Sequence, residues 1–101
     1  MNIITFCELD DNLIDSNHKV EYFNNGVSNK ADIFIIDIDS IFEFEENKNN
    51  NSKEKFVSIA LIHDESDYDA FKNFGIDAWI KVSDIFKINA LLNLVEKRIL
   101  S

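Results

Sequence analysis

Carboxylates follow directly on an apolar run in the middle of the chain. Residues 33–36 are all isoleucine or phenylalanine, which is typical of a central parallel strand that helices cover on both faces. Asp37 and Asp39 come next, and open α/β sheets bind their ligands at the carboxyl ends of such strands. Carboxylate oxygens hold Mg²⁺, and an aspartate can be the nucleophile toward a phosphoryl group. The pattern therefore predicts metal or phosphoryl chemistry at this edge of the sheet.

Charged residues also stand near the ends of two other predicted strands. Asp10 and Asp11 follow the apolar run at 3–9, and Lys81 lies near the end of the run at 76–82. Two acids, a central aspartate and a lysine are the components of a divalent-cation and phosphoryl site.

The end of the first strand and the register of the last strand each leave an alternative open. If the first strand stops at Phe6, Glu8 is the acid at its end that could hold a metal. Residues two apart in a regular strand share a face, so Lys81 would point the same way as Trp79. A β-bulge at this point would turn Lys81 to the opposite face from Trp79. Without a bulge, Val82 points to that opposite face in place of the lysine.

Strands and helices alternate along the second half of the chain. Apolar runs at 31–36, 56–62 and 76–82 predict strands, a capping box at Ser66 begins a helix, and Gly75 ends it. A final helix carries apolar residues at helical spacing from Ile85 to Ile99. The connections have the length of right-handed crossovers, which predicts α/β architecture: a three-layer sandwich around a parallel sheet.

The first half allows two interpretations. We prefer a helix over residues 13–25, capped from residues 10–12 and ended by Gly26. The alternation of Val20 and Tyr22 would equally suit a strand.

Two short segments follow the central strand. Residues 40–46 are expected to form one or two helical turns capped by Asp39 or Ser40. The asparagine-rich residues near 47–55 are expected to be a flexible polar loop on the surface.

These segments together resemble the receiver domain of two-component response regulators. DDNLI at 10–14 is similar to the acidic motif that opens the family, ADIFIIDI at 31–38 to its phosphoacceptor strand, and GIDAWIK at 75–81 to its glycine, aromatic and lysine segment. The resemblance implies one flavodoxin-like, receiver-like domain over residues 1–101. It also implies residue roles: phosphoacceptor Asp37; Mg²⁺ ligands Asp10, Asp11 and Asp37, with Glu8 as the alternative; and phosphoryl-contact or switch residues Lys81 and Trp79.

The chain departs from the family pattern in ways that affect function. It is about one βα unit too short between Asp11 and Asp37, so the first half is abbreviated and an edge strand is expected to be lost or vestigial. No hydroxyl ends the strand at 56–62, since the only threonine is Thr5 and Ser58 comes too early; no proline follows the lysine. We therefore expect a divergent receiver or pseudo-receiver that signals through protein contacts and is not an enzyme, whether or not Asp37 accepts phosphate.

The resemblance also implies the partners. A histidine kinase or a downstream effector, including a fused output domain, would bind the module, and a homodimer would form through the last strand and helices. The alternative interpretation starts from Asp37 and Asp39, which resemble the Asp-x-Asp opening of haloacid-dehalogenase-type phosphatases. That resemblance implies a fragment of a Mg²⁺-dependent enzyme with Asp37 as nucleophile and Asp39 as general acid.

Composition narrows the range of binding partners and cellular compartments that the sequence allows. Nineteen acidic residues against ten basic ones give a net charge of −9, which disfavours nucleic acid and anionic membranes as partners. No apolar run reaches the length of a membrane span. The single cysteine, Cys7, forms no internal disulfide, which together with the missing signal peptide indicates a cytoplasmic protein. Gly26 and Gly75 are the only glycines, so a glycine-rich phosphate loop is excluded.

Overall fold

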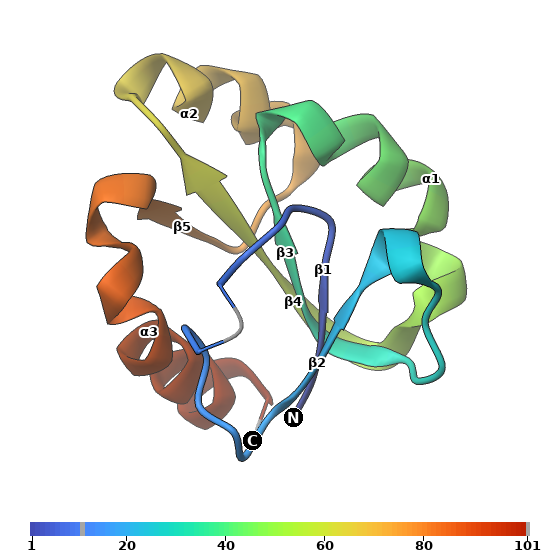
Figure 1. Cartoon of the computed structure of the whole chain (residues 1–101). Coiled ribbons are helices and arrows are strands. Elements are labelled where there is room, and N and C mark those ends of the chain that lie inside the picture. Colours follow the sequence, from blue (N-terminus) through green and yellow to red (C-terminus); the bar gives the residue numbers. More distant parts are fainter. Residues whose placement is uncertain (11, 101) are drawn as a thin grey trace.

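Five parallel strands form one sheet in the computed structural model of the chain, which describes residues 1–10 and 12–100 (Figure 1). They lie in the order β2-β1-β3-β4-β5, the strand order of flavodoxin-like folds. The predicted α/β sandwich with a parallel central sheet is confirmed. The strands are β1 (Asn2–Thr5), β2 (Lys19–Tyr22), β3 (Ala31–Ile36), β4 (Ser52–Ile62) and β5 (Ala78–Lys81).

Helices cover both faces of this sheet. Right-handed crossovers that step the same way along the sheet place their helices on the same face, so α1 (Ile41–Asn51) and α2 (Glu65–Phe71) share one face and α3 (Ile88–Val95) covers the other (Figure 1). Short helical turns adjoin these elements: η1 (Phe23–Asn25), η2 (Ile38–Ser40), η3 (Lys72–Phe74), η4 (Val82–Lys87) and the π-helical η5 (Glu96–Leu100).

The central position of β3 is confirmed by its pairing and burial. It pairs with β1 on one side and β4 on the other. All four side chains from Ile33 to Ile36 are fully buried, because alternate residues enter the cores on the two faces of the sheet. Asp37 follows at the carboxyl end of this strand.

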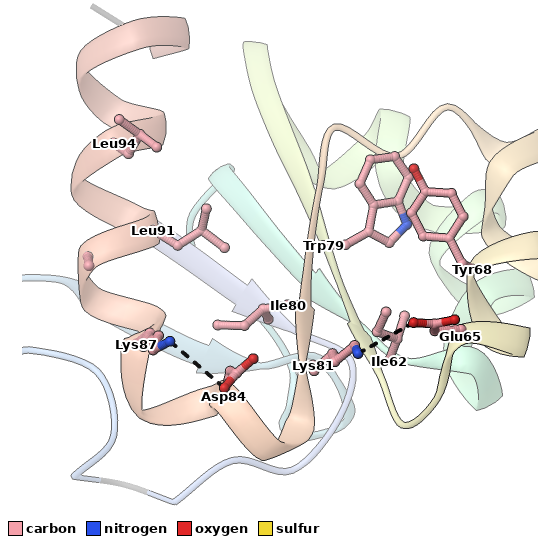
Figure 2. Close-up of a pocket in the computed structure, with 11 residues that line it drawn as sticks. Ile62, Glu65, Tyr68, Trp79, Ile80, Lys81, Asp84, Lys87, Leu91 and Leu94 are labelled. Atoms are coloured by element: carbon pink, nitrogen blue, oxygen red, sulfur yellow. Dashed lines mark ion pairs between the residues drawn. The ribbon is translucent and has the colours of Figure 1, made fainter.

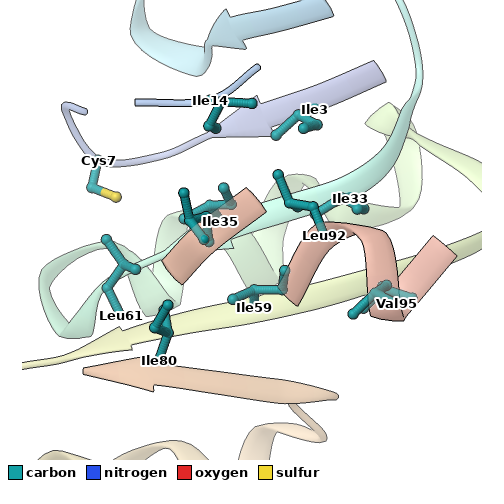
Figure 3. Packing of buried hydrophobic residues seen from close by; sticks show 12 residues of the cluster. Ile3, Cys7, Ile14, Ile33, Ile35, Ile59, Leu61, Ile80, Leu92 and Val95 are labelled. Carbon is teal, nitrogen blue, oxygen red and sulfur yellow. The ribbon is translucent and has the colours of Figure 1, made fainter. Parts of the chain in front are cut away.

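The α3 face is closed by one apolar stripe. Ile88, Leu92 and Val95 are spaced by four and three residues, so they project from one side of the helix. All three are buried, and Figure 3 shows Leu92 and Val95 over Ile33 and Ile59 of the sheet. Burying each such side chain contributes roughly 1.5–3 kcal/mol.

The prediction of a helix over residues 13–25 is wrong, and the edge strand that was expected to be lost or vestigial is present with four residues. Residues 19–22 form β2, which pairs in parallel with β1 from Asn2↔Lys19 to Thr5↔Tyr22. The N–H of Lys19 also donates to the carbonyl oxygen of Met1 at 3.0 Å. The backbone N–H and C=O groups of these residues form hydrogen bonds with β1, a distant segment that local helix signals do not reflect. The strand alternative is therefore the correct one.

The abbreviated part of the fold is the connection between β1 and β2. Residues 6–18 contain no helix among the residues described there. Cys7 and Ile14 from this connection instead fill the core on the α3 face. Asn89 of α3 fastens the connection, because its Oδ1 accepts from the Asp15 N–H at 2.9 Å and its Nδ2 donates to the Leu13 carbonyl at 3.0 Å.

The loop expected near 47–55 is also absent. Helix α1 continues to Asn51 and β4 begins at Ser52. The asparagines take part in the helix, since Asn47 Nδ2 and Asn51 Nδ2 each donate to the carbonyl four residues earlier at 2.8 Å. Lys48 also pairs with Glu45 at 3.1 Å. These local side-chain bonds stabilise a helix in a segment whose composition alone indicates a loop.

The helix after β4 begins two residues earlier than predicted. Asp64, not Ser66, is its N-cap, and the Asp64 carboxylate accepts from the Ser66 N–H at 2.8 Å. Gly75 does end the helical segment, with a left-handed φ of 66° that favours glycine.

The described part of the chain has a radius of gyration of 12.4 Å, close to the roughly 13 Å of a folded domain of 100 residues. Over residues 1–10 and 12–100, every helix is too short or too polar to cross a bilayer.

Candidate functional site

A cavity of about 260 Å³ lies at the carboxyl edge of the sheet. The ends of four strands meet there because all five strands run in the same direction. Its lining residues come from the connection after β1, from the position after β3, from the end of β4 and from the turn after β5: Cys7, Glu8, Leu9, Asp10, Leu13, Asp37, Leu61, His63, Val82 and Ile85.

Asp37 lines this cavity and caps the helical segment that follows it. Its Oδ1 accepts from the N–H of Ser40 at 3.0 Å and from the Ser40 Oγ at 2.8 Å. The N–H of Asp37 donates back to Ser40 Oγ at 3.0 Å, which completes a capping box. The sequence predicts the cap at Asp39 or Ser40. Ser40 does stand at the N-cap position of α1 but makes no side-chain capping bond there, whereas Asp37 caps the preceding turn and Asp39 is exposed. Both bonds that the Asp37 carboxylate accepts from Ser40 are made to Oδ1, and among the described residues none is made to Oδ2.

Both acids proposed as alternatives at the end of the first strand reach the same cavity. β1 stops at Thr5, and the following connection brings Glu8 and Asp10 to the lining. Asp11 lies outside the described residues. The carboxylates have the oxygen chemistry that suits Mg²⁺, which often binds through only one or two of them together with water. Within residues 1–10 and 12–100, however, no three acidic, cysteine or histidine side chains gather as a metal site.

Lys81 does not lie in this cavity. β5 pairs with β4 in an unbroken register from Ile59↔Ala78 to Ile62↔Lys81, so no bulge turns the lysine around. Its Nζ lies 3.8 Å from Glu65 Oε1 of α2. Val82, the alternative, lines the cavity with Asp37 instead. The structure thus brings together Glu8, Asp10 and Asp37 but separates them from Lys81.

Cys7 and His63 line this cavity together with Asp37, although the sequence patterns assign neither residue to the site. Burial, and secondarily the negative charge of Asp37, raise the pKa of the Cys7 thiol to about 12, so Cys7 is a neutral thiol at pH 7. His63 is the first residue after β4, and its position directly after an apolar run is the signal that could have identified it. Ser58 is engaged elsewhere, because its Oγ lies 3.2 Å from Asp77 Oδ2.

A second and larger cavity, a groove of about 830 Å³, follows the edge strand β5 (Figure 2). Figure 2 shows β5 between α2, which presents Tyr68, and α3, which presents Leu91 and Leu94. We call it the β5 groove; it is lined by Ile62, Glu65, Tyr68, Trp79, Ile80, Lys81, Asp84, Lys87, Ala90, Leu91 and Leu94.

Apolar and aromatic side chains dominate the exposed surface of the β5 groove. Tyr68 and Leu94 are 45% and 46% exposed. Leucine is usually buried in folded proteins, and tyrosine is intermediate. Tyr68 packs on Trp79 with ring centroids 4.8 Å apart. The Trp79 Nε1 is buried and finds no hydrogen-bond partner among the described residues. Trp79 is therefore a groove residue and lies outside the Asp37 cavity.

Comparison with known proteins adds no family. No protein-family model matches the chain, and neither a curated protein nor a solved structure matches it. The structure establishes the chain as an α/β protein with a five-stranded parallel sheet of order 2-1-3-4-5, consistent with a flavodoxin-like fold.

Proposed function

We propose that the chain is a receiver-like signalling module that acts through protein contacts and catalyses no reaction of its own. The observation that carries this proposal is the β5 groove, where apolar and aromatic side chains from the edge strand and two helices gather at the surface. Exposed apolar side chains that form one contiguous patch often mark an interaction surface, whereas single exposed apolar residues are common on any protein. The partner that we propose is a histidine kinase or a downstream effector.

The Asp37 cavity supports the receiver-like part of the proposal. Asp37 follows the central strand, and Glu8 and Asp10 line the same cavity, which supports a receiver-like origin, although the three acids do not converge as a metal site among the described residues. Oδ1 of Asp37 is bound to Ser40, and Lys81 pairs with Glu65. This geometry favours contacts that do not depend on phosphorylation of Asp37.

Photo-cross-linking tests the contact surface. A photoreactive amino acid is placed at position 94 in the β5 groove and, as a matched control, at position 20 on the opposite edge strand, where Val20 is similarly exposed at 43%. We expect one partner protein that is captured from position 94 and not from position 20. Its affinity should be equal for the wild type and Asp37→Asn, and about tenfold weaker for Leu94→Glu, since the introduced carboxylate must be desolvated in the interface. Equal capture from both positions would contradict the proposal.

A titration with Mg²⁺ and beryllofluoride tests whether Asp37 can accept a phosphoryl group. Trp79 is the only tryptophan and reports through its fluorescence. A flat response in the wild type and in Asp37→Asn supports a pseudo-receiver. A saturable response that Asp37→Asn lacks makes Asp37 a phosphoacceptor with a metal site, and partner affinity should then be compared with and without beryllofluoride.

A further inference from the structure

We propose that the β5 groove binds an extended, positively charged segment of the partner, which adds as a sixth strand to the outer edge of β5. This inference rests on the proposed function, because it names the kind of partner segment that the groove accepts.

The floor of the groove is an open sheet edge. β5 is the last strand in the order β2-β1-β3-β4-β5 and pairs only with β4. Within residues 1–10 and 12–100, no backbone hydrogen bond joins its other side. A row of unpaired N–H and C=O groups is the template on which an extended peptide adds a strand.

The side chains of β5 alternate between the two walls of the groove. Ala78 and Ile80 belong to the core on the α3 face, whereas Trp79 packs in the core on the α2 face. A strand added about 4.8 Å further out would alternate in the same way. Its successive side chains would therefore face opposite walls.

Both walls of the groove offer apolar contacts. On one side Tyr68 of α2 covers Trp79, with ring centroids 4.8 Å apart. On the other side Leu91 and Leu94 of α3 line the groove. The occupant that matches these walls is an extended segment with apolar residues facing both sides.

The opposite edge strand lacks this arrangement. The cavity beside β2 has a volume of about 290 Å³ and is lined from β2, η1 and the connection after β1, without a residue of α1, α2 or α3: Leu9, Asp10, Ile14, Val20, Tyr22 and Asn25. Strand addition is therefore assigned to β5, and β2 serves as its internal control.

The negative charge of the chain favours a partner segment that carries lysine or arginine. The groove itself is locally balanced, because Lys81 faces Glu65 at 3.8 Å and Lys87 faces Asp84 at 3.9 Å. Exposed ion pairs of this kind are weak and open readily, so Glu65 and Asp84 can each accept a lysine or arginine of the partner. The field of the whole chain, with a net charge of −9, attracts cations and repels a second copy.

The length of the edge also disfavours a second copy. β5 has four residues and spans about 13 Å, which suits a segment of about five residues. A stable dimer buries roughly 800 Å² on each partner, more than pairing along so short an edge supplies.

Peptide selection on the whole chain tests the inference. A random twelve-residue peptide library is selected on the immobilised wild type after depletion on Leu94→Glu. We expect enriched peptides that carry lysine or arginine and apolar residues at alternate positions, and that change Trp79 fluorescence. Single N-methylations should weaken binding about tenfold at every second position and little in between, because only alternate N–H groups of an added strand bond to β5. Val20→Glu should bind these peptides like the wild type.

The other outcomes each overturn the inference. No enrichment, or peptides that bind Leu94→Glu equally, removes the groove as a peptide site. Groove-dependent peptides without the two-residue N-methyl pattern exclude strand addition but leave the proposed protein-contact function intact. Acidic consensus peptides contradict the charge argument, and sedimentation that shows a wild-type dimer but a Leu94→Glu monomer assigns the groove to a second copy.

Discussion

The carboxylate of Asp37 and the hydroxyl of Ser40 lie 2.8 Å apart, and this bond joins the candidate phosphoacceptor to the start of the next helix. Ser40 is buried, so the bond is shielded from water on one side. The residue that sequence patterns mark for chemistry therefore also has a structural role, which any variant of Asp37 will affect.

Substitutions at Asp37 should separate its capping role from its charge. Asp37→Ala removes the acceptor for the N–H and hydroxyl of Ser40 and should lower the free energy of unfolding by about 1 kcal/mol. Asp37→Asn keeps a side-chain oxygen and should cost only a few tenths. Urea unfolding followed by circular dichroism measures both. Asp39→Ala, at an exposed neighbouring aspartate, is the control and should be neutral; equal losses in all three variants would exclude the cap.

Asn89 should hold the connection between β1 and β2 against α3. Asn89→Ala removes the bonds to Asp15 N–H and the Leu13 carbonyl, so we expect a loss of about 1 kcal/mol. Amide hydrogen exchange should become faster at residues 13–15 than in the core strands. Asn93→Ala, one turn further along α3 on its exposed side, is the matched control. Unchanged exchange in Asn89→Ala would mean that core packing alone holds the connection.

Cys7 should be a poorly reactive thiol. Its pKa of about 12, raised by burial and by the charge of Asp37, leaves about a thousandfold less thiolate at pH 8 than an unfolded cysteine has. Iodoacetamide labelling measured by mass spectrometry should be slow in the native chain and fast in urea. Asp37→Asn should label faster than the wild type, but still slowly because burial is the larger cause. A native labelling rate equal to that in urea would contradict the burial of Cys7.

Asp32 should contribute to stability at neutral pH and lose that contribution in acid. Burial acts to raise its pKa, but hydrogen bonds from the Asn2 N–H at 2.8 Å and Lys53 Nζ at 3.0 Å outweigh it and lower the pKa. A folded pKa below the unfolded value of about 3.9 gives stability above pH 4 that disappears as the pH falls through the folded pKa.

Urea midpoints between pH 7 and pH 2.5 test this contribution. Asp32→Asn should be less stable than the wild type at pH 7, and the difference should shrink toward pH 2.5. Asp39→Asn should follow the wild type throughout. A constant difference at every pH would show that the Asp32 contribution is not electrostatic.

Local patterns in the sequence predicted the centre of the fold. The apolar run at 33–36 and residues 57–62 of the run at 56–62 are buried in β3 and β4, and the helical spacing of residues such as Ile88 and Leu92 appears as α3. These features are readable because burial on one or both faces imposes a period on neighbouring residues. The position of Asp37 at the carboxyl edge follows from the same run.

Only the tertiary structure decided β2 and the arrangement of the charged residues. Val20 and Tyr22 form a strand because β1 is available to pair with them, which no local signal states. Lys81 faces Glu65 and not Asp37 because the register of β5 on β4 sets its direction. The sequence by itself determined the buried runs of β3 and β4 and the apolar stripe of α3, because burial imposes a local period. Contacts between distant segments decided where β1 ends, whether β2 forms and which charges meet, because register and pairing are set by partners far apart in the chain.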